Sequence, residues 1–276
     1  MNYLELRCEV FPKRYVEIVI AALAEFGFES FAETGKGFSA FIPEKIFNKP
    51  AFESLEILHQ KKIKINYSLD KIPDQNWNAL WESNFEPVQI GNDCYIRAPF
   101  HPALPDIKYE IIIEPKMSFG TGHHETTHMM VELLLSQNVR NKEILDMGCG
   151  TAVFAILAGK MGASKILAVD NDEWAYHNSI ENIDKNKVSG IEVILGDASV
   201  INNRTFDLIL ANINRNVLLQ DMTLYASALK EAGIILMSGF YENDLTAVSK
   251  KAEQCNLQPV RYCTMNHWCA AVSTKK

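Results

Sequence analysis

The chain has 276 residues, 47% of them hydrophobic and 22% charged, an ordinary globular composition for one large domain or for a core domain with a smaller one. The net charge of −7 argues against nonspecific nucleic-acid binding, because neutralising phosphates requires clustered Lys and Arg. No apolar run approaches the roughly 20 residues that span a bilayer, so we expect no membrane partner. The six cysteines lack C-x-x-C spacing and the first residues lack the features of a signal peptide, so we expect a cytoplasmic protein with reduced thiols.

The first 70 residues predict a small α+β domain. Apolar residues alternate as in strands or recur at helical spacing, in the order strand 2–10, helix 13–26, strands 28–32 and 37–42, helix 44–59 and strand 63–69. This β-α-β-β-α-β order is that of a ferredoxin-like unit. The segment contains no cluster of Cys, His or paired acids. We therefore expect residues 1–70 to serve recognition or dimerisation, and not chemistry.

Residues 71–92 are predicted to link this domain to a larger one at 93–276. The stretch is polar, contains two prolines and carries Trp77 and Trp81, which are four residues apart and so share one face of a short helix. We interpret the two tryptophans as anchors that dock one domain on the other.

A glycine-rich loop, F-G-T-G at 119–122, precedes a helix that runs to Leu135. The first turn of a helix has free backbone N–H groups, and here it also has threonine hydroxyls, so this segment is suited to wall one side of a ligand pocket. The letters H-E-x-x-H at 124–128 match the zinc motif of metallopeptidases. The motif stands at a helix start and no third ligand follows it in a helix, so we predict no metal site.

The central stretch, 143–172, predicts a strand, a glycine turn, a helix and a second strand. Gly148 and Gly150 lie in the turn, and Asp170 ends the second strand. Glycines in such a turn let the backbone approach a ligand closely, and an acid about 20 residues further on accepts hydrogen bonds from both ribose hydroxyls. The unit therefore predicts a cofactor that contains a nucleoside.

The turn itself, D-M-G-C-G-T-A at 146–152, favours S-adenosylmethionine over a dinucleotide. A dinucleotide fold has G-x-G-x-x-G and holds a pyrophosphate at the helix N-terminus. Asp146 would repel a pyrophosphate, whereas it suits a cation such as an amino group or a sulfonium. A nicotinamide-dependent dehydrogenase is the less favoured alternative.

The next two strands also end in polar residues, Asp197 after strand 191–195 and Asn212 after strand 206–211. Ligands of open α/β sheets bind at the carboxyl ends of the strands. We therefore expect convergence of the glycines, acids and amide at these ends, namely Gly148, Gly150, Asp170, Asp197 and Asn212. Asp197 is placed to accept from an adenine amino group.

Helices are predicted over 172–186, 217–230 and 242–254, and a hairpin over 259–264 and 267–273. The alternation predicts an α/β fold with a Rossmann-like, doubly wound sheet of five parallel strands and a last, antiparallel strand.

Residues 74–276 resemble the ribosomal protein L11 methyltransferase (PrmA) family. The resemblance rests on four motifs: W-x-x-x-W-x-x-N-F-x-P at 77–87, F-G-T-G-x-H-x-T-T at 119–127, D-x-G-C-G at 146–150 and A-N-I at 211–213. The family commonly has T-H-P-T-T where this chain has H-H-E-T-T at 123–127, and a small residue or Leu in place of Asn214.

The resemblance implies a class I methyltransferase sheet with a smaller N-terminal ferredoxin-like domain that grips the substrate. By position, the family's contacts to S-adenosylmethionine fall on Thr127, Gly148, Asp170 and Asn212. It implies methylation of lysine ε-amino groups and of the N-terminal α-amino group of the large-subunit ribosomal protein L11. We expect a monomer that does not contact nucleic acid directly.

Methyl transfer is an in-line displacement, so the enzyme chiefly aligns two reactants and excludes water. We expect Asn212 to be the catalytic residue, holding the amine lone pair toward the methyl group through its side-chain oxygen while Thr127 and loop 120–122 close over it. No general base is predicted. A methyltransferase of the same fold that acts on RNA or on another protein stays open as an alternative, as does, more distantly, a zinc peptidase.

Overall fold

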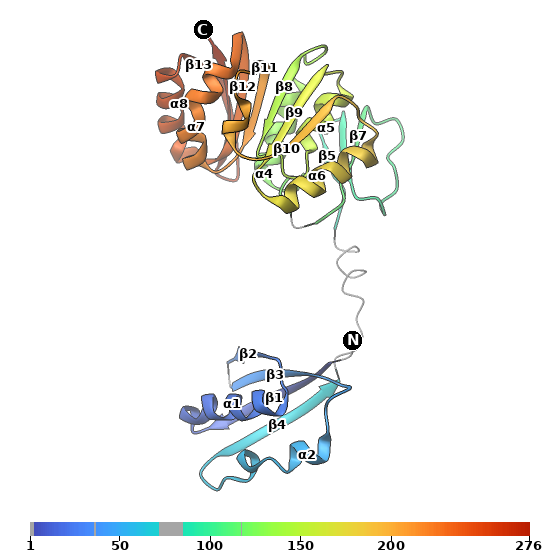
Figure 1. The fold of residues 1–276 in the computed structure, drawn as a ribbon, viewed down its shortest axis with the longest axis vertical. Helices are drawn as coiled ribbons and strands as arrows, with labels where there is room; N and C mark the ends of the chain where they lie inside the picture. The colour runs from blue at the N-terminus through green and yellow to red at the C-terminus, as the bar shows by residue number, and fades with distance from the viewer. Residues whose placement is uncertain (1–2, 36, 72–84, 117) are drawn as a thin grey trace. The chain divides into compact units, whose positions relative to one another are not determined.

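A computed structural model of the chain describes residues 3–35, 37–71, 85–116 and 118–276. The chain divides into two units, Met1–Asn84 and Phe85–Lys276, and the described residues of each pack around hydrophobic cores of their own (Figure 1). Trp77 and Trp81 lie outside the described residues, so their docking role stays a prediction. All six cysteines are unpaired. Within the described ranges, no helix has both the length and the apolar character needed to cross a membrane.

The N-terminal unit is an antiparallel sheet with helices on one face. Its strands have the order β2-β3-β1-β4, with β1 Tyr3–Phe11, β2 Ser30–Thr34, β3 Gly37–Pro43 and β4 Lys64–Lys71. The 3-10 helix η1 (Lys13–Tyr15) leads into α1 (Val16–Phe26). Leu6, Cys8 and Val10 alternate along β1 and pack against Val19 and Leu23 of α1. The predicted ferredoxin-like α+β order is confirmed.

The helix predicted over 44–59 is wrong in its extent. Only α2 (Lys49–Glu53) is α-helical, and η2 (Glu56–His59) is a short 3-10 helix. Pro50 stands in the first turn and has no N–H with which to continue a helix from the preceding residues. The side chain of Asn48 accepts a hydrogen bond from Ala51 N at 3.1 Å and so starts the helix there.

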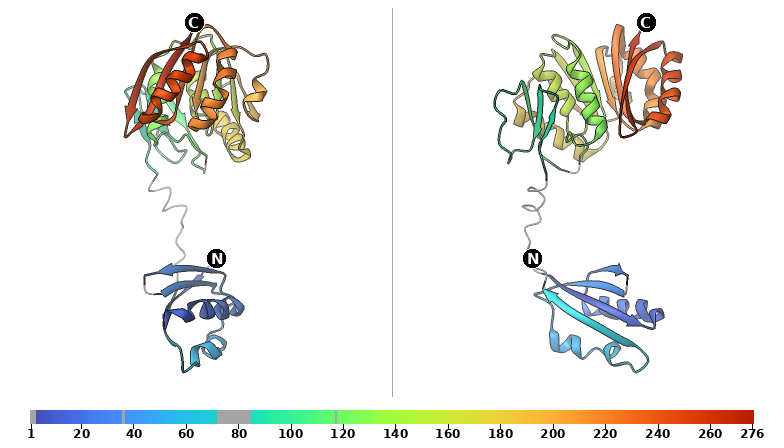
Figure 2. Two further views of the ribbon diagram at one scale, coloured as in Figure 1. Left: turned by 90° about the vertical axis from the view of Figure 1, so that its left-hand side faces the viewer. Right: turned by 180° about the vertical axis from the view of Figure 1, so that it is seen from behind.

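The larger unit is built on a seven-stranded sheet with the order β10-β9-β8-β11-β12-β14-β13 (Figures 1 and 2). The strands are β8 Glu143–Met147, β9 Lys165–Asp170, β10 Ile191–Leu195, β11 Phe206–Asn212, β12 Leu229–Tyr241, β13 Leu257–Met265 and β14 Trp268–Lys275. The first five in this order pair in parallel, and β14 is antiparallel to both of its neighbours. The predicted doubly wound sheet is confirmed.

Helices cover both faces of this sheet (Figure 2). One face carries α4 (Glu125–Leu135), α5 (Val153–Lys160) and α6 (Glu173–Asn186), and the other carries α7 (Arg215–Ala228) and α8 (Leu245–Gln254). The short helices η3 (Ala198–Ile201) and η4 (Glu242–Asp244) follow β10 and β12. The core strands are apolar on both faces because both faces are buried.

Several boundaries differ from the prediction, and two of the differences have a local reason. The helix expected to reach residue 230 ends at Ala228, because Leu229 and Lys230 already belong to β12. The final hairpin turns at Asn266 and His267, one residue later than expected, since both adopt positive φ, 47° and 68°, as a two-residue hairpin turn requires.

A small sheet precedes α4. It consists of β5 (Val88–Ile90), β6 (Cys94–Arg97) and β7 (Tyr109–Ile112), with β5 antiparallel and β7 parallel to β6. Val88–Ile90 falls within the stretch expected to be a linker, yet it is a strand of the larger unit. Residues 72–84 of that stretch lie outside the described part of the chain.

Candidate functional site

Four parallel strands, β8 to β11, bring their carboxyl ends to one edge of the sheet. These ends carry Gly148, Asp170, Asp197 and Asn212. Hydrogen bonds tie adjacent ends together. Gly150 N donates to Asp170 Oδ2 at 2.8 Å, and Gly196 N donates to the Asp170 carbonyl at 2.8 Å. The sheet therefore brings all four predicted strand ends to one side of the molecule.

The turn after β8 requires its glycines. Gly148 and Gly150 have positive φ, 68° and 53°. A Cβ on Gly148 would lie 2.3 Å from Ile213 Cγ2, and one on Gly150 would lie 2.2 Å from the Phe119 carbonyl oxygen. The bare backbone of the turn thus packs between the residue after Asn212 and loop 119–122. Ala152, at the N-cap of α5, also has positive φ, 62°.

Asp146 lies buried beneath this turn, with 1% of its surface exposed. Its Oδ2 accepts a hydrogen bond from Ala155 N at 3.0 Å, while Oδ1 has no hydrogen-bond partner within the described part of the chain. Burial raises the pKa of this carboxyl to about 8, and the nearby Asp170 acts in the same direction. A buried acceptor without a partner is costly, so this oxygen is suited to a ligand that donates.

Asp170 is 9% exposed and is held by two backbone donors, Gly150 N on Oδ2 at 2.8 Å and Asp172 N on Oδ1 at 3.0 Å. Its carboxylate is therefore fixed in orientation, and each oxygen keeps a further lone pair for ligand hydroxyls. Asp197 is exposed, and its Oδ1 accepts from Ser199 N at 2.9 Å. Hydrogen bonding to the Ser199 side chain, and then to its backbone N–H, lowers the pKa of Asp197.

Loop 119–122 packs on the glycine turn. Thr151 N donates to the Phe119 carbonyl at 2.9 Å, and Thr151 Oγ1 donates to the Gly120 carbonyl at 2.6 Å. The loop leads into α4, where His124 Nδ1 caps the helix by accepting from Thr126 N at 3.2 Å. Thr127 in the first turn is fully buried, and its Oγ1 is without a partner among the described residues.

A cavity of about 230 Å³ opens between this loop and the end of β11. Its lining comes from loop 119–122, α4, β11, β12 and β14 and consists of Phe119, His124, Thr126, Asn212, Ile213, Asn214, Gly239 and Trp268. Both amide atoms of Asn212, Oδ1 and Nδ2, are buried and find no hydrogen-bond partner in the described ranges. A cavity lined by aromatic rings and one unused amide is suited to an apolar chain that ends in a polar nitrogen.

Aromatic side chains form one wall of this cavity. The His124 ring lies 5.1 Å from Phe119 and 4.8 Å from Trp268, centroid to centroid, in edge-on geometry. Trp268 in turn stacks on Tyr241 at 4.1 Å. These segments are far apart in sequence, so the wall depends on the fold of the whole unit.

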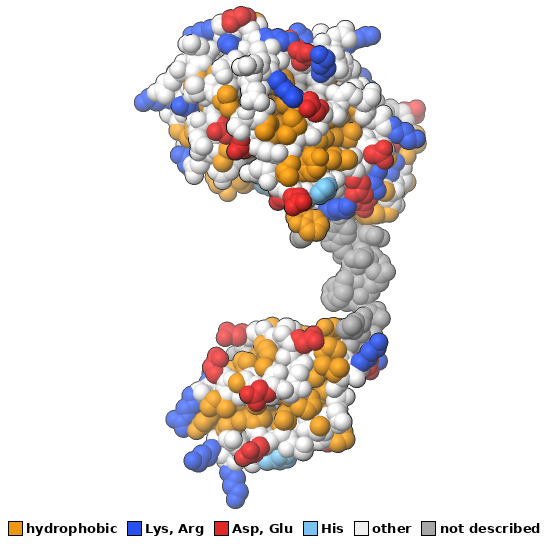
Figure 3. All heavy atoms as spheres, viewed as in Figure 1, with side chains coloured by type: hydrophobic (Ala, Val, Ile, Leu, Met, Phe, Trp, Pro, Cys, Tyr) orange, Lys and Arg blue, Asp and Glu red, His pale blue; other side chains and the backbone are white. Residues whose placement is uncertain are grey.

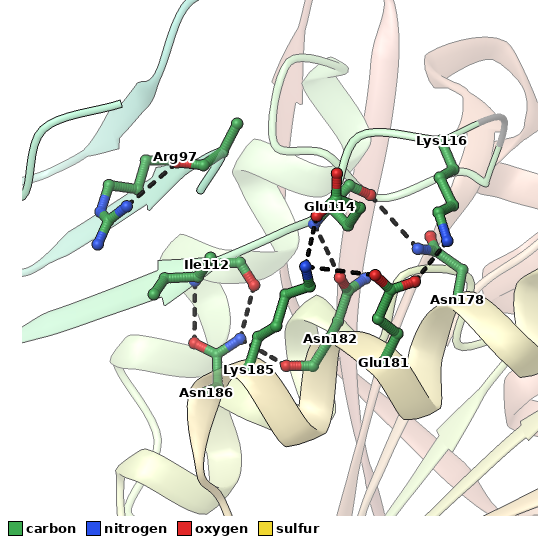
Figure 4. Close-up of polar contacts among 10 residues, drawn as sticks. Arg97, Ile112, Glu114, Lys116, Asn178, Glu181, Asn182, Lys185 and Asn186 are labelled. Atoms are coloured by element: carbon green, nitrogen blue, oxygen red, sulfur yellow. Dashed lines mark hydrogen bonds and ion pairs between the residues drawn. The ribbon is translucent and has the colours of Figure 1, made fainter. Parts of the chain in front are cut away.

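Three asparagines on α6 hold the backbone that leads into loop 119–122 (Figure 4). They recur every four residues, at Asn178, Asn182 and Asn186. Asn186 pairs with both backbone groups of Ile112, at 2.9 and 2.6 Å. Asn182 accepts from Glu114 N at 2.8 Å and donates to the Thr151 carbonyl at 3.0 Å. The ladder therefore couples the strand before the loop to the glycine turn.

The two histidines of the H-E-x-x-H letters make separate contacts. His124 precedes α4, and its Nδ1 caps the helix by accepting from Thr126 N. His128 Nε2 instead lies 3.6 Å from Glu132 Oε1. In the part of the chain that the structure describes, no three His, Cys, Asp or Glu side chains gather as metal ligands would. His123 bonds Thr121 and the Glu86 carbonyl.

The structure thus joins Gly150 to Asp170 by a hydrogen bond and packs Gly148 against Ile213, the residue after Asn212. Thr127 lies in the first turn of α4, which follows loop 119–122. Asp197 lies at the same edge and follows Gly196, whose N–H donates to the Asp170 carbonyl at 2.8 Å. Sequence reasoning missed Trp268 and assigned no function to His124, which both line the cavity. It also missed the asparagine ladder, although the spacing of four residues was a usable signal.

The unused atoms fit S-adenosylmethionine. Asp146 Oδ1 can accept from an ammonium group, and the fixed Asp170 carboxylate from ribose hydroxyls. The missing side chains at Gly148 and Gly150 leave a cradle in which a nucleoside can approach the backbone.

Comparisons with known proteins agree with this geometry. Residues 22–276 match the model of the family described as ribosomal protein L11 methyltransferase (PrmA). The ribosomal protein L11 methyltransferase of Phocaeicola vulgatus is 42% identical over 275 residues, covering 98% of both chains, and that of Porphyromonas gingivalis is 45% identical over 259 residues, covering 92% of this chain and 89% of its own. A crystal structure titled ribosomal protein L11 methylase, from Lactobacillus delbrueckii subsp. bulgaricus, superposes with a TM-score of 0.65 at 24% identity, over 70% of this chain and all of that one.

Proposed function

The chain belongs to the ribosomal protein L11 methyltransferase (PrmA) family and is an S-adenosylmethionine-dependent methyltransferase, and we propose that it methylates lysine ε-amino groups and the N-terminal α-amino group of ribosomal protein L11. The proposal that the methyl acceptor is an amine rests on the side chain of Asn212. Its amide oxygen and nitrogen are both buried without partners in the described ranges, in a cavity with aromatic walls.

The residues at the sheet edge would hold the cofactor. Asp146 and Asp170 offer acceptors to its ammonium and its ribose hydroxyls, Asp197 to its adenine amino group, and the Gly148 and Gly150 backbone gives it room. Thr127 offers a buried hydroxyl from the first turn of α4. When bound, S-adenosylmethionine supplies an activated methyl group on a cationic sulfur.

The cavity favours the neutral form of the acceptor amine. A free lysine has a pKa of about 10.4, and an apolar environment lowers it because burial disfavours the charged form. Phe119 and Trp268 provide such an environment. Asn212 Oδ1 accepts an N–H of the neutral amine, which leaves the nitrogen lone pair free for attack. Alignment of this kind contributes roughly 7–11 kcal/mol to lowering a bimolecular barrier.

We assign substrate recognition to residues 1–70, the linker to 71–92 and catalysis to 93–276. Alternate residues of β1 in the N-terminal unit, Arg7, Glu9 and Phe11, are exposed, and its described residues include no group of His, Cys, Asp and Glu that could hold a metal ion. Both observations support a binding role. Acidic and basic side chains are interspersed over the face seen in Figure 3, and the net charge is −7, so we propose that the protein does not bind nucleic acid directly. Six unpaired cysteines support a cytoplasmic protein, and we propose that it acts as a monomer.

Transfer of labelled methyl groups tests this function. Ribosomes from cells lacking the enzyme are incubated with labelled S-adenosylmethionine, and we expect label in protein L11 and none in RNA. Asn212→Ala should lower kcat by about 100-fold or more, as loss of a preorganised hydrogen-bonding group does. Asn216→Ala, an exposed neighbour at the start of α7, is the control. Label in RNA, or full turnover by Asn212→Ala, would refute the proposal.

A further inference from the structure

The turn between β13 and β14 is tied to the start of α4. Asn266 Nδ2 donates a hydrogen bond to Glu125 Oε1 at 2.9 Å, across 141 positions of sequence. Glu125 is the first residue of α4 and directly follows His124, which lines the cavity. The contact with Asn266 is the largest cause of a lowered pKa at Glu125, so the carboxylate is ionised at neutral pH.

The same turn is held on its other side. The His267 carbonyl accepts from Glu242 N at 2.8 Å, at the end of β12. Asn266 and His267 both have positive φ, the conformation that a two-residue hairpin turn requires. A two-residue turn that is fixed by hydrogen bonds from two sides holds the next residue, Trp268, in one place.

The residue held in place by these hydrogen bonds is Trp268. It lines the same cavity as Asn212, and its ring centroid lies 4.8 Å from that of His124, the residue before Glu125. Its other neighbour, Tyr241, stacks on it at 4.1 Å and precedes Glu242. The two hydrogen bonds of the turn therefore join it to Glu125 and Glu242, which directly follow the two residues whose rings contact Trp268.

We propose that Glu125 and Asn266 form a clasp that positions Trp268 as a wall of the cavity that receives the substrate amine. Glu125 is thus a positioning residue for the protein substrate and has no part in holding the cofactor. The identity of the substrate rests on the proposed function, whereas the position of Trp268 can be tested without it.

Paired variants test the clasp. Asn266→Asp keeps a residue that tolerates positive φ but replaces the donor with a second carboxylate, which repels Glu125. Glu125→Pro keeps a residue suited to the first position of a helix but has no acceptor. The double variant Glu125→Gln with Asn266→Asp restores the bond with donor and acceptor exchanged. Glu132→Ala, an exposed acid on the same helix, is the control.

The first readout is ¹⁹F NMR of protein labelled with fluorotryptophan. The chain has four tryptophans, and Trp268→Phe assigns the resonance of interest. We expect Asn266→Asp and Glu125→Pro to shift or broaden the Trp268 signal and to leave that of Trp174 unchanged, and the exchanged pair to return it. A Trp268 signal that is the same in both single variants and in the native protein overturns the clasp.

The second readout separates substrate binding from cofactor binding. We expect the single variants to raise KM for ribosomal protein L11 by roughly 3- to 10-fold, the size of one lost hydrogen bond, and to leave cofactor Kd within about twofold. The double variant Glu125→Gln with Asn266→Asp should bring KM most of the way back to the native value. An unchanged KM beside an active native enzyme overturns the role of the clasp. If the native enzyme transfers no methyl group to L11, the proposed function fails, and the NMR result alone decides whether the clasp positions Trp268.

Discussion

The backbone N–H of Gly150 donates a hydrogen bond to Oδ2 of Asp170 at 2.8 Å. This bond joins the turn after β8 to the end of β9, and it orients the carboxylate before any ligand arrives. Asp172 N occupies the other oxygen at 3.0 Å. A preoriented acceptor costs less entropy to engage when a ligand hydroxyl reaches it.

Asp170→Asn should weaken cofactor binding by about 10- to 100-fold. The amide can place its oxygen toward only one of the two backbone donors, so the other N–H loses its acceptor, and the charged acceptor for the ribose is gone. Titration calorimetry with S-adenosylmethionine measures the change. Asp184→Asn, at an exposed position on α6, should bind like the native protein. Equal affinities for the two variants would contradict the role of Asp170.

Gly148→Ala should destabilise the protein more than Gly91→Ala. Both glycines have positive φ, 68° and 58°, so each substitution costs about 1 kcal/mol in backbone strain. At Gly91 a Cβ meets nothing within 4 Å, whereas at Gly148 it would lie 2.3 Å from Ile213 Cγ2, and overpacking adds about 1–3 kcal/mol.

Urea unfolding of the two glycine variants measures this difference in free energy. Only Gly148→Ala should also weaken cofactor binding and slow turnover, because Ile213 adjoins Asn212. Combining it with Ile213→Ala, which removes the clashing methyl group, should recover part of the stability. Similar losses at both glycines would mean that the turn can relax around the added Cβ.

The residues at the strand ends of the site could be predicted from the sequence because each of them is adjacent in the chain to the strand that it follows or ends. The spacing of apolar residues predicts each strand and helix, and Gly148, Gly150 and Asp170 are found at the ends of the predicted strands. The carboxyl ends of neighbouring parallel strands lie at one edge of a sheet, so these residues are expected there. Thr127 was predicted as a cofactor contact only from the family motif, because the spacing of apolar residues does not distinguish it from its neighbours. Helix 44–59 was predicted too long because its apolar period continued through Pro50, where the missing N–H allows only a short helix.

The wall of the cavity could not be predicted in this way. Trp268, Tyr241 and His124 come together only when β12, β14 and α4 are packed, and nothing in the letters around any one of them indicates the other two. The same holds for Glu125 and Asn266. The asparagines of α6 do show a spacing of four residues, but the backbone groups that they bind belong to segments placed by the tertiary fold.

Asn182→Ala should lower the free energy of unfolding by about 2–5 kcal/mol. The substitution leaves Glu114 N without its acceptor and the Thr151 carbonyl without its donor, in a fully buried environment. Denaturant unfolding measures the loss, and Asn138→Ala, at an exposed position, should change stability by less than about 0.5 kcal/mol. A loss at Asn182 no larger than at Asn138 would show that water replaces both bonds.

Binding of S-adenosylmethionine should strengthen as pH rises from 6 toward 8. Burial raises the pKa of Asp146 to about 8, so its carboxyl is neutral in the free protein at neutral pH. An ammonium group beside Oδ1 favours the carboxylate, so binding releases a proton, and Kd should fall by up to about tenfold for each pH unit below the pKa. Calorimetry in buffers of different ionisation enthalpy measures the released proton directly.

Asp146→Asn is the matched control, because the titration of the ligand's own amino group is common to both proteins and only the pH dependence due to Asp146 disappears.

The raised pKa of Asp146 also predicts how the stability of the ligand-free protein depends on pH. The folded pKa lies above the ordinary value of 3.8, so the neutral carboxyl stabilises the fold fully below about pH 4, and this contribution is lost as pH rises to about 8. The native protein should therefore lose stability over this interval relative to Asp146→Asn. Parallel pH profiles of the two proteins, in unfolding and in binding, would show that Asp146 is already ionised in the free enzyme and that its buried oxygen holds the ligand without a proton exchange.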